Sequence, residues 1–136
     1  MPDIKRTFNL PKRIIIAWDE SQEATRAVHD ALPFLKCAEN INVVCVSNEP
    51  EEEKANIIYS DALRKHLSHH NISVEITYED QLADGIGKTI LQNAIEYDAD
   101  LIVMGAYGST RLKEIVLGGA TRYLLTNTTI PLFLSH

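Results

Sequence analysis

Cysteine, tryptophan and long apolar runs are scarce in this sequence. It contains two cysteines, Cys37 and Cys45, and one tryptophan among 136 residues. Two separated cysteines do not supply the ligands of a zinc site, and their apolar neighbours predict two reduced thiols that line the core. Because no apolar stretch is long enough for a signal peptide or a membrane span, we expect a cytoplasmic protein that does not enter a membrane.

Positive charge is also in deficit. The chain has 13 Lys and Arg against 19 Asp and Glu, which gives a formal net charge of −6. A protein whose main activity is to bind nucleic acid or an anionic membrane surface carries the opposite balance, so we expect neither partner. The length, together with a hydrophobic content of 45%, fits one globular domain with a sizeable core.

Short apolar runs alternate with helical patterns along most of the chain. The runs predict five strands, at residues 13–17, 41–47, 72–76, 101–104 and 130–134. The polar residues 1–12 are expected to form an N-terminal arm, and residues 13–136 a single domain.

Strands that alternate with helices predict an α/β fold with an open, parallel five-stranded sheet and helices on both faces. Right-handed crossovers leave few topologies, and one of them is the Rossmann-like strand order 3-2-1-4-5. The loops 17–19 and 105–111 would then meet at the switch point between the first and fourth strands. Ligands of such sheets bind at this point, beyond the carboxyl ends of the strands.

Helical periodicity indicates which side chains face the sheet. Ser21 or Asp19 can cap the first turn of the first helix. Pro33 lies within the pattern of the same helix and predicts a kink or an early end. The second helix has one apolar face, formed by Ala55, Ile58, Tyr59, Ala62, Leu63 and Leu67. In the third helix the inward residues are expected to be Ile86, Ile90, Leu91, Ala94 and Ile95.

Glycines cluster behind the fourth predicted strand. Gly105 and Gly108 follow the apolar run directly, and the pair Gly118–Gly119 precedes the last helix. Such a loop exposes backbone N–H groups, and a helix N-terminus adds the positive end of its dipole, so anions and above all phosphates bind there. Glycine permits φ > 0 and keeps a Cβ away from the phosphates. Glycines that only form tight turns are the alternative, but three glycine sites behind one strand favour an anion site.

Several polar residues near this loop have two interpretations. Asp19 either caps a helix or bonds a ribose, a base or a divalent ion, and Trp18 either packs on the sheet or lines a base pocket. The hydroxyls of Ser109, Thr110 and Thr121 suit phosphate oxygens better than nucleophilic catalysis. Arg111 either neutralises phosphate or lies in solvent. No Ser-His-Asp or Cys-His set falls in the pocket, so no catalytic residue is predicted.

Two further patterns have structural explanations. The stretch 85–89 resembles a phosphate loop, but Leu82 occupies the position of its first glycine, so we interpret it as a helix start capped by Asp84. His66, His69 and His70 lie at the predicted end of a helix, where positive charge is favourable. Without a matching carboxylate or cysteine they do not indicate a metal site.

These stretches resemble the universal stress protein family over nearly the whole chain after the arm. Residues 14–21 are similar to the first strand and aspartate turn of the family, and residues 100–108 to its fourth strand. The family's nucleotide signature is G-x2-G-x9-G-(S/T). Gly105, Gly108 and Gly118 match it, whereas Gly119 stands in the last position and removes one hydroxyl donor. The Trp-Asp and Gly-Gly-Ala-Thr sequences are similar to those in the second half of family members that contain two domains in tandem.

The resemblance implies an adenine nucleotide alpha hydrolase-like fold that binds ATP or AMP, with Mg2+ as an open question. In binding members the position of Val46 holds adenine through its backbone, and the glycine loops hold ribose and phosphates. The implied site comprises Ala17, Trp18, Asp19, Val46, Met104, Gly105, Tyr107, Gly108, Ser109, Thr110, Arg111, Gly118, Gly119, Ala120 and Thr121.

The resemblance also implies a homodimer formed through the strand 130–134 and a role in stress resistance without a defined reaction. The expected function is that of a nucleotide-binding stress-response regulator. A dimeric interaction scaffold that binds no nucleotide is the alternative, and a weak ATP hydrolase is a third reading.

Overall fold

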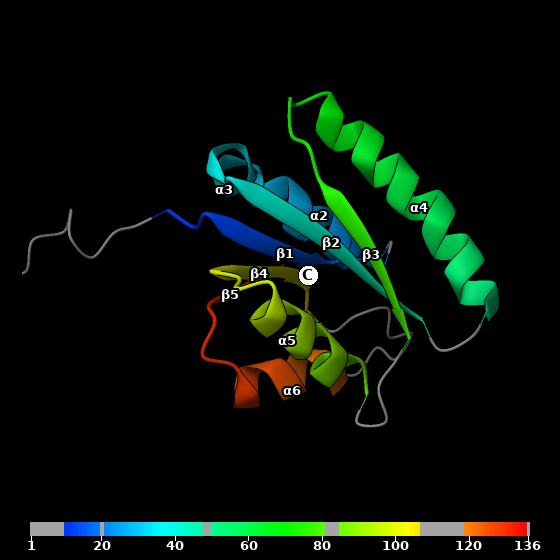
Figure 1. Ribbon diagram of the computed structural model, residues 1–136, viewed down its shortest axis with the longest axis vertical. Coiled ribbons are helices and arrows are strands. Elements are labelled where there is room, and N and C mark those ends of the chain that lie inside the picture. The colour runs from blue at the N-terminus through cyan, green and yellow to red at the C-terminus, as the bar shows by residue number, and fades with distance from the viewer. Residues whose placement is uncertain (1–9, 20, 48–49, 81–84, 107–118, 136) are drawn as a thin grey trace, which may run out of the picture.

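Strands and helices alternate along the chain in the computed structural model, which describes residues 10–19, 21–47, 50–80, 85–106 and 119–135. In chain order the elements are β1 (Arg13–Ala17), α2 (Gln22–Asp30), α3 (Leu32–Cys37), β2 (Asn40–Ser47), α4 (Pro50–Ser68), β3 (Glu75–Asp80), α5 (Ile86–Glu96), β4 (Leu101–Gly105), α6 (Gly119–Asn127) and β5 (Leu132–Ser135) (Figure 1). The predicted arm lies mostly outside the described residues and stays a prediction.

All neighbouring strands are parallel, and their order is β3-β2-β1-β4-β5. The predicted sheet is therefore confirmed. Ile14 of β1 pairs with Ile41 of β2 on one side and with Leu101 of β4 on the other, so β1 occupies the centre. The strands up to β3 are added on one side of β1, and β4 and β5 are added on its other side. The switch point expected of this topology therefore lies between β1 and β4.

Helices cover both faces of the sheet, as Figure 1 shows. Successive side chains of a strand point to opposite faces, so Ile14 and Ile16 pack with α2, α3 and α4, whereas Ile15 and Ala17 pack with α5 and α6. We call these the α2/α4 face and the α5/α6 face. The central strands are apolar on both faces because both are covered.

The first helix ends early, as predicted from Pro33. The helix α2 ends at Asp30, Ala31 forms the junction, and Pro33 lies in the first turn of α3, where a missing N–H costs nothing. Ser21 is the N-cap of α2, whereas Asp19 bonds the turn before the helix. The Ser21 hydroxyl accepts from the Ala24 N–H at 3.0 Å, and the Asp19 carboxylate accepts from the Ser21 N–H at 3.0 Å.

Some predicted boundaries and faces are wrong. The third strand is an edge strand, as expected, but it begins at Glu75, after two of the apolar residues assigned to it. The helix α5 is capped by Gly85, whose φ of 104° favours glycine, and Asp84 lies outside the described residues. Ile86 and Ile95 are 39% and 62% exposed, although periodicity placed both inward.

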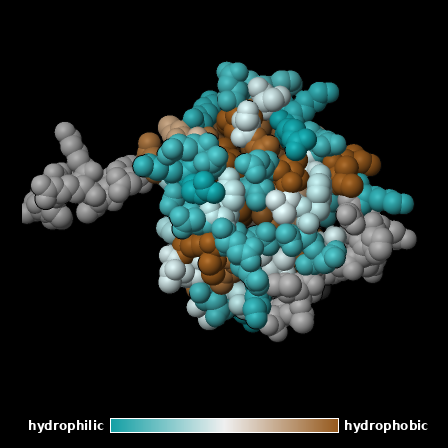
Figure 2. Space-filling view, in the orientation of Figure 1, coloured by the Kyte–Doolittle hydropathy of each residue, from teal (hydrophilic) through white to brown (hydrophobic). Residues whose placement is uncertain are grey.

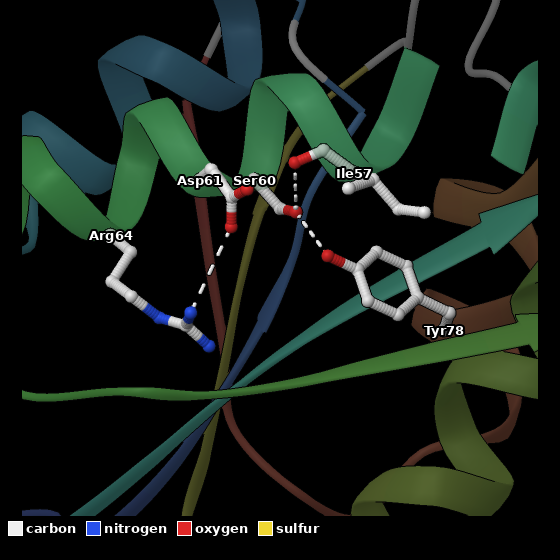
Figure 3. A network of polar contacts seen from close by, with 5 residues as sticks. All are labelled: Ile57, Ser60, Asp61, Arg64 and Tyr78. Carbon is white, nitrogen blue, oxygen red and sulfur yellow. Dashed lines mark hydrogen bonds and ion pairs between the residues drawn. The ribbon is translucent and has the colours of Figure 1, made fainter. Parts of the chain in front are cut away.

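The helix α4 is buried along only part of its predicted apolar face. Leu63 and Leu67 are buried, whereas Ile58 is 68% exposed. Ser60 holds the helix to the sheet edge, because its hydroxyl donates to the Ile57 carbonyl at 3.1 Å and lies 2.6 Å from the Tyr78 hydroxyl of β3 (Figure 3). Hydrophobic residues consequently remain on the surface where α4 lies (Figure 2).

The two cysteines differ in their surroundings. Cys45 is buried, as predicted, but Cys37 is exposed. Burial, followed by the negative charge of Asp19, raises the pKa of the Cys45 thiol to about 12, so this thiol stays protonated. No described helix combines the length and the apolar character needed to cross a bilayer.

Candidate functional site

The carboxyl ends of β1 and β4 lie side by side at the switch point. Ile16 pairs with Val103, and each strand tip is fixed by a hydrogen bond just beyond its end. The Trp18 N–H donates to the Val44 carbonyl at 3.0 Å, and the Ala106 N–H donates to the Ser135 carbonyl at 2.7 Å. The backbone around the candidate site is thus fixed from β2 on one side and from β5 on the other.

Four predicted site residues meet on the α5/α6 face. Ala17 of β1 and Met104 of β4 are buried there, and Val46 of β2 and Ala120 of α6 pack partly buried against the same cluster. These side chains carry no charge and few polar atoms. Such a surface suits the flat face of an aromatic base, whose ring atoms are then bonded by backbone groups.

Trp18 does not share this surface. Its side chain packs against the α2/α4 face, one residue along the strand from Ala17 and therefore on the other side of the sheet. Of the two interpretations offered for Trp18, the structure supports packing. Its indole Nε1 is buried and has no hydrogen-bond partner among the described residues.

Asp19 is exposed at the tip of β1 and acts as a cap for the turn before α2, through its bond to the Ser21 N–H. Its negative charge also raises the pKa of Cys45, as described above. Capping does not remove the carboxylate from solvent, so a contact with a ligand stays a prediction.

Gly105 has a structural reason to be glycine. A Cβ at this position would lie 2.5 Å from the Ala24 nitrogen and 2.6 Å from the Glu23 carbonyl carbon, in the first turns of α2. Its φ is not in the left-handed region. The close approach of α2 to β4 therefore explains this glycine without a phosphate.

Gly119 is in the opposite situation. It begins α6 and is exposed, and a Cβ added to it would meet no atom of the described residues within 4 Å. Its neighbour Thr121 is only 1% exposed, so a ligand at this helix start would contact backbone N–H groups rather than the Thr121 side chain. The remaining predicted site residues lie outside the described residues: Tyr107, Gly108, Ser109, Thr110, Arg111 and Gly118.

Metal ligands are not gathered within the described part of the chain, where no group of three His, Cys, Asp or Glu side chains could hold an ion. His66 and His70 contact each other edge to face at a ring separation of 5.2 Å. Partial desolvation lowers the pKa of His70, and the nearby charges of Lys36, His66, His29 and His69 lower it further. Edge-to-face packing and the lowered pKa of His70 describe a histidine cluster at the end of α4, and the absence of a metal there stays a prediction.

Comparison of this sequence and fold with known proteins identifies a family. The sequence profile of the Universal stress protein family matches residues 11–136. No curated protein matches the chain significantly. Among solved structures, the hypothetical protein MJ0577 is 24% identical with a TM-score of 0.68, and the alignment covers 93% of this chain and 96% of that one.

Two further structures have the same fold. The universal stress protein UspA from Lactobacillus plantarum is 19% identical with a TM-score of 0.72, over 92% of this chain and 97% of its own. A universal stress protein in complex with cAMP is 17% identical with a TM-score of 0.69, over 94% and 98%. Because the family profile covers almost the entire sequence, this chain belongs to the universal stress protein family.

Proposed function

We propose that this protein is a stress-response regulator that binds an adenine nucleotide, ATP or AMP, at the carboxyl ends of β1 and β4. The observation that carries the proposal is the meeting of Ala17, Val46 and Met104 on the α5/α6 face. The start of α6, marked by Gly119, belongs to the same face. An apolar surface beside a helix N-terminus suits an apolar base joined to an anionic tail.

The parts of the nucleotide have separate partners in this proposal. Adenine lies against Ala17 and Met104 and bonds the backbone of Val46, while the phosphates lie at the first N–H groups of α6. Tyr107, Gly108, Ser109, Thr110, Arg111 and Gly118, which lie outside the described residues, are expected to supply the remaining contacts. Support comes from the family and from its member in complex with cAMP, which is itself an adenine nucleotide.

Magnesium would enter this site mainly with the phosphates. Mg2+ prefers oxygen ligands and keeps several of its waters. Asp19 is the carboxylate at the described ends of β1 and β4, and one of its oxygens already caps the turn before α2. We therefore expect Mg2+ to strengthen ATP binding more than AMP binding, through the phosphates rather than through a protein cage.

A regulatory role is favoured over hydrolysis by the same residues. The described side chains at the ends of β1 and β4 are apolar apart from Asp19, so they offer no imidazole to activate a water. Binding then acts by stabilising one conformation or one dimer surface.

The decisive experiment is calorimetric titration with ATP and AMP of wild type, Gly119→Ser and the matched control Gly119→Ala. A serine hydroxyl bonded to a phosphate contributes on the order of 1.5–3 kcal/mol, so Gly119→Ser should tighten ATP about tenfold and leave AMP and the alanine control unchanged. The open space around a Cβ at this position permits both substitutions. The dissociation constants of wild type for ATP and AMP should differ by about threefold or less.

Two outcomes would contradict this picture in different ways. If wild type binds neither nucleotide, and mass spectrometry of the purified protein finds none, the scaffold alternative replaces the nucleotide proposal. If wild type already prefers ATP by more than about tenfold, the site stands but the phosphates are held by backbone groups and Arg111 instead of by a hydroxyl.

We also propose that the protein is a homodimer joined through β5. This strand lies at the edge of the sheet, and its residues 132–134 are apolar. An uncharged edge strand is a template for pairing with a second copy. Since the carbonyls of residues 131 and 135 accept bonds from β4, the alternation of the ladder turns the N–H of Leu134 outward.

Leu134→Pro removes that outward donor, whereas Leu134→Thr keeps it and serves as the control. Light scattering should show monomers for the proline variant and dimers for the control and wild type. Phe133 is unsuitable as a test position, because its ring packs against Phe34 at a centroid distance of 6.0 Å. A monomeric wild type at micromolar concentration would exclude this interface.

A further inference from the structure

A cavity of about 530 Å3 lies between α2 and α4, beside Trp18 at the end of β1. It is on the α2/α4 face, so the sheet separates it from Ala17, Met104 and the proposed nucleotide site. Its volume is within the range of roughly 300–1,000 Å3 that is usual for small-molecule sites. The sequence motifs gave no indication of it, because its lining comes from two helices apart from Trp18.

The inner wall of the cavity is apolar. Val28 of α2 and Leu63 of α4 are buried core residues, and Trp18 and Tyr59 contribute aromatic rings. Ser60 and Tyr78 fix α4 at β3 (Figure 3), and Ile58 and Tyr59 on the same helix are 68% and 40% exposed. A ligand with an apolar body would cover surface that is otherwise exposed to water.

The rim of the cavity carries basic side chains. Arg26 and His29 of α2 and His66 of α4 are exposed members of its lining, and none of the described lining residues is acidic. His70 lies near enough to His29 and His66 for their charges to interact. Arg26 carries a permanent positive charge, and an imidazole donates an N–H bond in either protonation state. The described rim therefore offers N–H donors that suit an anion.

A buried donor adds a second polar feature. Trp18 lines the cavity, and its Nε1 has no hydrogen-bond partner among the described residues. A buried N–H without a partner is costly, and such groups in proteins call for an explanation.

We propose that the cavity between α2 and α4 binds a small amphipathic carboxylate, with its apolar chain against Val28, Leu63 and Trp18 and its carboxylate at Arg26, His29 and His66. Medium-chain fatty acids and aromatic carboxylates share this chemistry. This site is independent of the nucleotide site on the other face of the sheet, and it would give the protein a second ligand.

Trp18 is the only tryptophan of the chain, so its fluorescence reports directly on the cavity. The full-length protein is titrated with octanoate, decanoate and dodecanoate below their micelle concentrations. Each should produce a saturable change in Trp18 emission, and each added methylene should tighten binding about threefold to fourfold until the cavity is full. Decanol should bind about tenfold more weakly than decanoate, and decyltrimethylammonium more weakly still.

Two variants separate charge from volume. Arg26→Gln should weaken decanoate about tenfold and leave decanol unchanged, while Arg122→Gln, an exposed arginine of α6, is the matched control and should change neither. Ala62→Phe places a ring in the cavity from α4 and should abolish the binding of both ligands. If circular dichroism shows that Ala62→Phe does not fold, the comparison of Arg26→Gln with Arg122→Gln decides the result.

Three results would overturn the proposal. The first is the absence of a saturable signal with any carboxylate. The second is equal affinity for decanoate, decanol and decyltrimethylammonium, which would indicate nonspecific apolar binding. The third is displacement of decanoate by ATP, which would make the cavity part of the nucleotide site.

Discussion

Gly105→Ala tests the closest contact between a helix and the sheet. The added methyl would lie 2.5 Å from the Ala24 nitrogen, 2.6 Å from the Glu23 carbonyl carbon and 2.7 Å from the Glu23 Cβ. These atoms belong to the backbone and first side-chain carbon of α2, so no flexible group can move away. An ordinary contact begins at 3.4 Å, which means that α2 and β4 must separate by about 0.9 Å.

The cost of this separation follows from the surrounding structure. The start of α2 is fixed by the Ser21 cap, and β4 is fixed between β1 and β5. Overpacking in such an environment costs about 1–3 kcal/mol, and a backbone contact belongs at the upper end. Since the φ of Gly105 is not left-handed, alanine also gains about 0.4–1 kcal/mol by restricting the unfolded chain. We expect a net loss of about 2 kcal/mol.

The assay is urea unfolding followed by circular dichroism, with Gly119→Ala as the control. A Cβ at Gly119 meets no atom of the described residues within 4 Å, so that variant should be unchanged or more stable by up to about 1 kcal/mol. The slope of the transition should be the same in all three proteins. If Gly105→Ala is within about 0.5 kcal/mol of wild type, α2 does not pack on β4 as described, and the steric explanation of this glycine is wrong.

Two other predictions concern the α2/α4 face. Tyr78→Phe removes the hydroxyl that lies 2.6 Å from Ser60, and urea unfolding should show a loss of about 0.5–1.5 kcal/mol. Ser60→Ala should lower the free energy of unfolding less in the Tyr78→Phe background than in wild type. If the two losses of free energy are strictly additive, the bond between Ser60 and Tyr78 does not form. The folded pKa of His70 is lowered, so the folded state binds fewer protons and stability should decrease as the pH falls through about 6.5. His70→Gln should reduce this decrease in thermal melts, and an identical pH profile would contradict the shift.

Much of the fold could be predicted because its signals are local and repeat. Apolar β-branched runs, such as the three isoleucines 14–16, indicate strands buried on both faces, and the handedness of crossovers then limits their order. Pro33 marked the end of α2 because a missing N–H acts within one turn. Ser21 was predictable as a cap for the same reason.

Other features depend on how distant elements pack, and the sequence does not contain that information in readable form. Periodicity placed Ile58 inward with Leu63, yet α4 is attached at β3 in a way that leaves Ile58 on the surface. The glycine spacing suggested a phosphate contact for Gly105, whereas the contact that excludes a side chain comes from α2. Both differences come from the position of a helix relative to the sheet, which local patterns do not determine.

The positions of Ala17 and Trp18 lead to a last prediction. Both were assigned to the nucleotide site from sequence, but side chains of successive strand residues point to opposite faces. Ala17 packs with α5 and α6, and Trp18 packs with α2 and α4. Trp18→Phe should therefore leave the ATP affinity within about twofold of wild type in calorimetry. The matched neighbour is Ala17→Leu, whose larger side chain would occupy the surface proposed for adenine.

For Ala17→Leu we expect ATP binding to weaken by about tenfold or more, with circular dichroism used to confirm that the variant folds. The comparison is informative because the two positions are adjacent, so both variants disturb the same strand tip. If Trp18→Phe weakens ATP as much as Ala17→Leu does, the nucleotide must extend to the α2/α4 face. The cavity between α2 and α4 would then hold part of the nucleotide, because the only tryptophan of the chain lines it.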